Sequence, residues 1–285
     1  ISSELIDKFL DSFENFKTSN SLFYSQSEHN WRRVKNDLDE NNFLISSFEN
    51  FTNLIWSNEM SFNGRNILQS DIILKKLQEL SEYSDFVMWQ NMLFDKSTGT
   101  VDHIDSWYLD TNPFGHLVAA WVALEDIDGT GGSFHVYPES HLDLDQSWRN
   151  INSHDDFLSW SNNLSSKYKK KEALLKKGDV LFWHPLLIHG ATNQLIDGRT
   201  RKSLTAHYFP KSLLQGRRGE TTSPKTKEYK KKVELRNKRI RYFNYPIASN
   251  ISRKRCIAWS IKGIINYFLT SNKTFDLMNR KNYNF

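Results

Sequence analysis

The sequence predicts a mainly β core flanked by helices at both ends of the chain, an α+β fold. In residues 1–84, apolar side chains recur at helical spacing, whereas residues 85–210 form short apolar runs separated by turn residues. Several short strands with regular turns are typical of a double-sheet barrel, or jelly roll. With 285 residues and 38% hydrophobic content, the chain can build one such barrel with helical additions. We therefore expect a single domain over residues 1–285.

The three parts of this domain differ in pattern. The N-terminal part carries apolar residues such as Leu5, Phe9 and Phe13, which predict helices with one apolar face. The strands of the core are punctuated by turns such as Asp128-Gly129 and Gly178-Asp179. Residues 142–172 break the strand pattern, which predicts an insertion between barrel strands. Such an insertion could be a substrate lid or only a surface helix.

The C-terminal part, residues 211–285, is predicted to be a basic helical extension. From Lys211 to Arg255 there are fifteen lysines and arginines against three acids, a net charge of +12; because the whole chain carries +5, the remainder carries −7. This asymmetry could attract an anionic or carrier-bound substrate or an anionic membrane surface, or it could belong to a solvated helix. No nucleic-acid-binding motif accompanies the charge, so no nucleic-acid partner is predicted.

The lengths of the apolar runs and the cysteine content indicate the cellular location of the protein. The longest apolar runs are far shorter than the ~20 residues of a membrane span, and the first residues lack the pattern of a secretion signal. The sequence has one cysteine, Cys256, so no internal disulfide can form and a reducing compartment is favoured. We expect a cytoplasmic protein without a transmembrane segment.

Three side chains in the core segment predict a catalytic metal site. His103 and Asp105 lie two apart in VDHIDSWYLD, and on a strand such residues face the same side. His189, 86 residues later in GDVLFWHPLLIHGATN, supplies a third ligand from another apolar run. Two imidazoles and one carboxylate hold Fe(II) on one face and leave its other positions open. His184, five residues before His189, is the competing histidine.

Two arginines follow the last of these ligands. Arg199 and Arg201 lie ten and twelve residues after His189, in DGRTRKSLTAHYFP. A planar guanidinium can clamp a carboxylate with two parallel hydrogen bonds. Metal ligands together with a carboxylate clamp fit the cosubstrate 2-oxoglutarate, whose 2-oxo acid end chelates iron while its far carboxylate meets an arginine. The spacing alone does not choose between the two arginines.

From about Phe86 to Pro210, the chain resembles the phytanoyl-CoA dioxygenase-like family of Fe(II)- and 2-oxoglutarate-dependent oxygenases. The resemblance is carried by FVMWQNMLF, the His-x-Asp pair, LVAAWVALEDI, SFHVYPESH, the run around His189, and RTRKSLTAHYF. It implies a cupin-like double-stranded β-helix. It assigns 2-oxoglutarate to Arg201, because the following Lys202-Ser203 matches the family's flanks better than the residues after Arg199. Trp121 stands where the family often has an aromatic beside the cosubstrate, although a core tryptophan would fit as well.

The resemblance also implies the reaction. We expect a dioxygenase that uses Fe(II), 2-oxoglutarate and O2, hydroxylates an unactivated C–H bond of a small-molecule or carrier-bound substrate, and releases succinate and CO2. Asp105 argues against the related halogenases, which have a small residue at that position. Proximity to the motifs suggests these substrate-side residues: Trp107, Tyr108, Phe134, Tyr137 and Trp183. The alternatives are a cupin-type metal-binding isomerase, a sugar-binding module, or a scaffold that has lost its chemistry.

Overall fold

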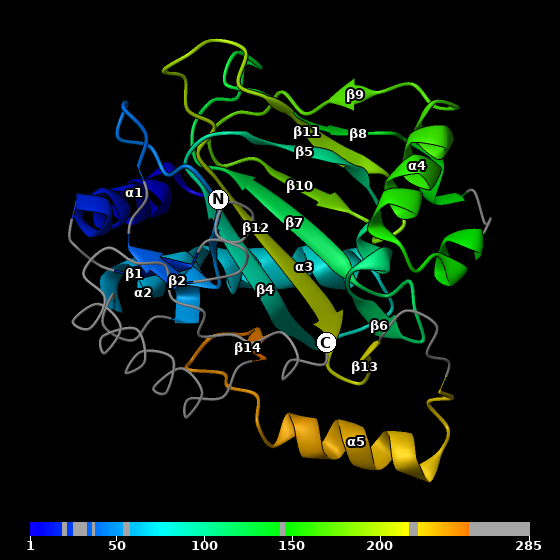
Figure 1. Ribbon diagram of the computed structural model, residues 1–285. Helices are drawn as coiled ribbons and strands as arrows, with labels where there is room; N and C mark the ends of the chain where they lie inside the picture. The colour runs from blue at the N-terminus through cyan, green and yellow to red at the C-terminus, as the bar shows by residue number, and fades with distance from the viewer. Residues whose placement is uncertain are drawn as a thin grey trace.

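The computed structural model describes residues 1–18, 22–24, 33–35, 38–53, 58–142, 146–216 and 222–250. Two mainly antiparallel sheets form the core, and the N-terminal helices pack on the outer side of the larger one (Figure 1). The N-terminal elements are α1 (Ser3–Thr18), β1 (Leu22–Tyr24), β2 (Arg33–Lys35), β3 (Phe48–Glu49), the 3-10 turn η1 (Phe51–Asn53), α2 (Asn58–Leu68) and α3 (Asp71–Leu80).

The larger sheet has the strand order β10-β7-β12-β4-β14, and β3 also pairs with β4. Its longer strands are β4 (Phe86–Phe94), β7 (Val118–Ala123), β10 (Val180–Trp183) and β12 (Ser203–Pro210), and β14 (Ala248–Ser249) forms one edge. β12 is central: Ser203 pairs with Phe94 of β4 on one side and with Ala123 of β7 on the other.

The smaller sheet has the order β5-β11-β8-β9, with β5 (Thr98–His103), β8 (Phe134–Val136), β9 (Lys171–Glu172) and β11 (His189–Asn193). A separate pair joins β6 (Asp110–Asn112) to β13 (Leu214–Gly216). The remaining elements are the 3-10 turns η2 (Asp105–Trp107), η3 (Ser140–Leu142) and η4 (Gln146–Asn150), with helices α4 (His154–Ser165) and α5 (Lys227–Asn237).

Alternation along β7 places its side chains in two different hydrophobic cores. Val118, Ala120 and Val122 face the helices, in a cluster with Phe9 of α1 and Ile73 of α3. Their neighbours face the other sheet and join a second cluster, whose buried members are Ala119, Trp121, Ala123, Ile127, Phe134, Ala173 and Trp183. Because successive strand residues point to opposite faces, one strand contributes to both cores. The inner core is the one that surrounds the site described below.

The predicted jelly-roll core with flanking helices is confirmed. The N-terminal part is not wholly helical, because β3 adds to the larger sheet. The insertion over residues 142–172 contains α4, which packs against β5 (Figure 1). The C-terminal extension contains α5, and residues 251–285 of that prediction lie outside the described chain. Over the described ranges, no helix combines the length and hydrophobicity needed to cross a membrane.

Candidate active site

The structure brings His103, Asp105 and His189 together. His103 ends β5, His189 begins β11, and the two residues are direct partners in the ladder between these strands. One ligand atom from each of the three residues lies within 4.8 Å of the others. The Nε2 atoms of His103 and His189 lie 3.7 and 3.5 Å from Oδ1 of Asp105. Asp105 does not share the strand with His103 as predicted: β5 ends at His103, and Asp105 lies two residues later, in η2.

Hydrogen bonds orient both imidazoles toward this point. Nδ1 of His103 lies 2.8 Å from the Val101 carbonyl oxygen, and Nδ1 of His189 lies 2.9 Å from that of Leu187. A protonated Nδ1 donates to the carbonyl and leaves the Nε2 lone pair free to bind a metal. Burial lowers the pKa of His189 to about 4, so this imidazole is neutral at pH 7.

The carboxylate between them is ionised. Burial by itself would raise the pKa of Asp105, but the imidazoles of His189 and His207 outweigh it, and the pKa lies well below its usual range. Its second oxygen, Oδ2, accepts a 2.9 Å hydrogen bond from Nε1 of Trp183. Two imidazoles and one buried carboxylate are a donor set that suits Fe(II).

The competing histidine, His184, lies apart from this cluster. Its ring packs against His141 at 5.5 Å between centroids, and its Nδ1 accepts a 3.2 Å hydrogen bond from the Leu186 amide. Asp102 also faces away from the cluster, as its place beside His103 predicts. Its Oδ1 lies 2.6 Å from Nε2 of His135, on the outer side of the smaller sheet.

The two candidate arginines are in opposite environments. Arg199 is exposed, whereas Arg201 is 2% exposed, with its guanidinium carbon 5.6 Å from the Phe94 ring centre and 5.7 Å from that of Trp121. Within the described part of the chain, Nε and Nη1 of Arg201 have no hydrogen-bond partner. Burial lowers its pKa to about 10, so it stays protonated at neutral pH. A buried cation that has no counter-ion among the described residues fits an anionic ligand.

Aromatic contacts connect Arg201 to the cluster of His103, Asp105 and His189, called the metal-ligand cluster below. Trp121 is 1% exposed and stacks on Phe134, with 5.5 Å between ring centroids. Phe134 in turn stacks on His189 at 5.5 Å. Trp121 is thus both a core tryptophan and a neighbour of Arg201, so the two interpretations of this residue are compatible.

The predicted substrate-side residues separate into three groups. Phe134 and Trp183 pack on His189 inside the barrel. Trp107 and Tyr108 lie between the cluster and α4: Trp107 stacks on Phe157 at 4.4 Å, and Tyr108 meets the His103 ring edge-on at 5.6 Å. Tyr137 packs in the same hydrophobic cluster as Trp107, but its hydroxyl points to Asp102, to which it donates a 2.5 Å hydrogen bond.

The sequence predicted no functional role for two histidines that lie near the site. His207 of β12 is buried, with Nε2 3.4 Å from Oδ2 of Asp105. The signal in the sequence was its spacing: His207 lies an even number of residues after Ser203, the first residue of β12, and so shares its face. His154, at the start of α4, lies with Nε2 2.9 Å from the Tyr108 hydroxyl. No local pattern marks it, because only the folding of the insertion brings it there.

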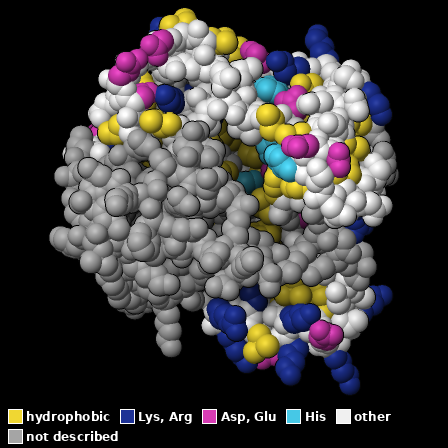
Figure 2. All heavy atoms as spheres, in the orientation of Figure 1, with side chains coloured by type: hydrophobic (Ala, Val, Ile, Leu, Met, Phe, Trp, Pro, Cys, Tyr) yellow, Lys and Arg dark blue, Asp and Glu magenta, His cyan; other side chains and the backbone are white. Residues whose placement is uncertain are grey.

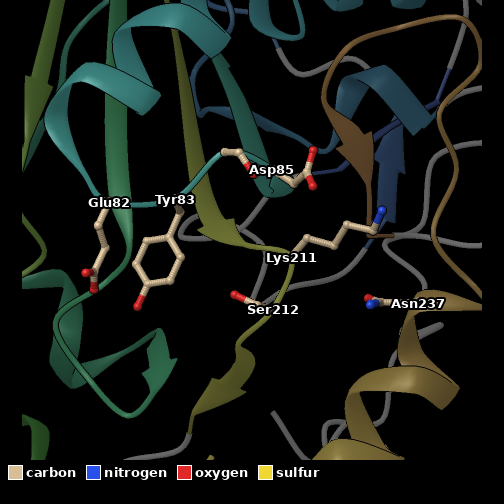
Figure 3. Close-up of a pocket in the computed structure, with 7 residues that line it drawn as sticks. Glu82, Tyr83, Asp85, Lys211, Ser212 and Asn237 are labelled. Carbon is tan, nitrogen blue, oxygen red and sulfur yellow. The ribbon is translucent and has the colours of Figure 1, made fainter.

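The molecular surface adds two features. On the face shown in Figure 2, histidine side chains border a hollow with largely hydrophobic walls. A separate cavity of about 350 Å³ lies beside the start of β4 and the end of β12 (Figure 3). Its lining residues are Glu82, Tyr83, Ser84, Asp85, Lys211, Ser212 and Asn237. None of them belongs to the metal-ligand cluster or contacts Arg201, so we assign it no chemistry.

A jelly roll with two imidazoles, one carboxylate and a buried arginine between its sheets defines a class, that of cupin-like proteins with a mononuclear metal site. The family model of Phytanoyl-CoA dioxygenase (PhyH) matches residues 1–202, and the chain belongs to this family. It is 31% identical over 116 residues to the peroxisomal phytanoyl-CoA dioxygenase of Bos taurus, covering 37% of this chain and 32% of that protein. It is 26% identical over 165 residues to a phytanoyl-CoA dioxygenase domain-containing protein 1 homolog of Caenorhabditis briggsae, covering 54% of each. The chain thus spans about a third to a half of the length of these relatives.

Solved structures support the fold. The epimerase SnoN from nogalamycin biosynthesis, crystallised with Fe3+, alpha ketoglutarate and nogalamycin RO, aligns with a TM-score of 0.55 at 17% identity, over 79% of this chain and 86% of that one. EctD from S. alaskensis with bound Fe aligns with a TM-score of 0.52 at 13% identity, over 76% and 72%. At such identities the likeness concerns the fold alone.

Proposed function

We propose that this protein is an Fe(II)- and 2-oxoglutarate-dependent dioxygenase that hydroxylates an unactivated C–H bond and releases succinate and CO2. The observation that carries the proposal is the pairing of the metal-ligand cluster with Arg201, a buried cation whose Nε and Nη1 find no partner in the described chain. Family membership supports it, as do structural relatives crystallised with iron and 2-oxoglutarate.

Each residue then has a definite task. His103, Asp105 and His189 hold Fe(II), Arg201 binds the far carboxylate of 2-oxoglutarate, and Trp121 forms a wall beside it. Arg199 is not given this role, because its side chain is exposed. When bound, iron and 2-oxoglutarate activate O2 for removal of hydrogen from a carbon atom. The protein fixes the ligands, keeps the His189 imidazole neutral and excludes water with Phe134 and Trp183.

The substrate side is proposed to lie toward α4. Trp107 and Tyr108 border the cluster there, and the hydrogen bond between Tyr108 and His154 ties the metal-binding segment to the insertion. Burial, followed by the charge of Asp105, raises the pKa of Tyr108 to about 12, so its hydroxyl stays protonated and can donate to a substrate. The insertion thus forms one wall of the substrate site.

The substrate is proposed to be a small molecule or a carrier-bound group with negative charge. The basic helix α5 supports this, because Lys227, Lys230 and Lys231 are exposed on it. Figure 2 shows lysine and arginine side chains gathered over this part of the molecule. The helix is held to the core by Tyr229, whose hydroxyl accepts a 2.9 Å hydrogen bond from the Leu214 amide. The single cysteine of the sequence supports a cytoplasmic location.

An anaerobic titration tests the reaction class without knowledge of the substrate. Adding 2-oxoglutarate to the Fe(II)-loaded protein should produce the weak visible charge-transfer band of the chelate. The exposed-site variant Arg199→Lys serves as a matched control and should behave like the wild-type protein. Iron binding without the band would contradict the proposal and favour a cupin-type isomerase or a sugar-binding module.

A further inference from the structure

The two oxygens of Asp105 lie in different surroundings. Oδ1 faces the Nε2 atoms of His103 and His189, at 3.7 and 3.5 Å. Oδ2 faces away from them, toward Nε1 of Trp183 at 2.9 Å and Nε2 of His207 at 3.4 Å. An indole N–H can only donate a hydrogen bond, so Oδ2 is the acceptor of the bond from Trp183. One oxygen is therefore directed to the metal position, and the other accepts a hydrogen bond from Trp183 of β10 and lies near His207 of β12.

His207 has no other task in the described part of the chain. It is 3% exposed, and neither of its ring nitrogens has a hydrogen-bond partner there. Its ring lies edge-on to Trp183, with 6.1 Å between centroids, so both side chains converge on the same carboxylate oxygen. The 3.4 Å separation is at the outer limit of a hydrogen bond, and such contacts tighten when ligands bind.

This arrangement matters because a metal ion has a limited number of coordination positions. An octahedral ion has six positions, of which two imidazoles and a carboxylate bound through one oxygen occupy three. The chelating end of 2-oxoglutarate takes two more, and one is left for O2. A carboxylate bound through both oxygens would take that last position.

We propose that Trp183 and His207 are positioning residues that hold Oδ2 of Asp105 away from the metal, so that the carboxylate binds through Oδ1 alone. The inference rests on the proposed function and deepens it. It means that two side chains outside the ligand set keep the O2 position of the metal free. Outer-shell partners of metal ligands commonly change affinity or activity by about 10- to 100-fold.

Nitric oxide tests this, because it binds the O2 position of Fe(II) and gives a characteristic electron paramagnetic resonance signal. The variants are Trp183→Phe and His207→Leu, singly and combined, with His207→Gln retaining a donor. Phe182→Leu is the control, since Phe182 lies on the same strand but packs against the helix-side core. The combined variant should bind nitric oxide about tenfold more weakly in the 2-oxoglutarate complex. Its chelate band should persist, and His207→Gln should match the wild type.

Three outcomes would count against the inference. Equal nitric oxide affinity in the wild type and the combined variant would overturn it. Loss of iron binding in every variant, His207→Gln included, would show that the two residues only support the fold, and would overturn it as well. A missing chelate band in the wild-type protein would overturn the proposed function and this inference with it.

Discussion

Arg201 is the residue whose conservative replacement should be most informative. Lysine keeps the charge but cannot form two parallel hydrogen bonds with a carboxylate. We expect Arg201→Lys to weaken 2-oxoglutarate binding by more than tenfold, since truncating one partner of a buried charge pair costs about 2–5 kcal/mol. Isothermal titration of the anaerobic Fe(II) protein measures this. Arg199→Lys, at an exposed position, should stay within about twofold. The reverse order would move the role to Arg199.

The three proposed metal ligands make a second prediction at this scale. His103→Ala, Asp105→Ala and His189→Ala should each abolish Fe(II) binding at micromolar iron, because each removes one of three donor atoms. Metal content after dialysis is the measurement, and circular dichroism should show a retained fold. His184→Asn is the matched control, and should retain iron. If His184→Asn lost iron while His189→Ala kept it, the third ligand would have to be reassigned.

Among elements, β11 depends on a glycine. A Cβ at Gly190 would lie 2.5 Å from Oδ1 of Asp102 and 2.9 Å from Nε2 of His135, so the hydrogen bond between these residues crosses the strand where Gly190 has no side chain. Gly190→Ala should therefore destabilise the protein by about 1–3 kcal/mol, measured by urea unfolding. In a double-mutant cycle, His135→Ala should cost less in the Gly190→Ala background than in the wild type. Additive costs would show that the crossing bond is not the cause.

Sequence patterns specified some elements of the site better than others. The strands were predictable because alternation marks both faces, as in β7, and because His189 and Arg201 stand beside recognisable strands. The position of Asp105 in a turn was not predictable, because that turn depends on a contact with a distant residue. The Ser106 amide donates a hydrogen bond to the Pro185 carbonyl at 3.0 Å. His154 was missed for a similar reason, because its approach to Tyr108 is made by tertiary packing of α4. The clustering of His103, Asp105 and His189 was predictable from the sequence, but the side chains that surround this cluster were not.

Across the whole molecule, charge is distributed unevenly, and this affects association. If α5 attracts an anionic substrate, raising ionic strength should lower kcat/KM several-fold while kcat changes little, because salt screens the encounter. Changing Lys227, Lys230 and Lys231 together to Gln should reproduce the loss at low salt. The matched control replaces Lys75 and Lys76, which are exposed on α3. A kcat/KM that responds to neither treatment would mean that α5 is only a solvated surface.

If Arg201 binds 2-oxoglutarate as proposed, its enclosed guanidinium also makes folding stability depend on the concentration of 2-oxoglutarate. Holding an uncompensated charge among Phe94 and Trp121 costs folding free energy, and a bound dicarboxylate would offset that cost. Saturating 2-oxoglutarate, at about 100 times its Kd, should stabilise the protein by about 2.7 kcal/mol and raise its Tm accordingly. Arg201→Met should raise the Tm of the ligand-free protein and abolish this response. The cell's supply of 2-oxoglutarate would then govern the lifetime of the folded protein as well as its turnover.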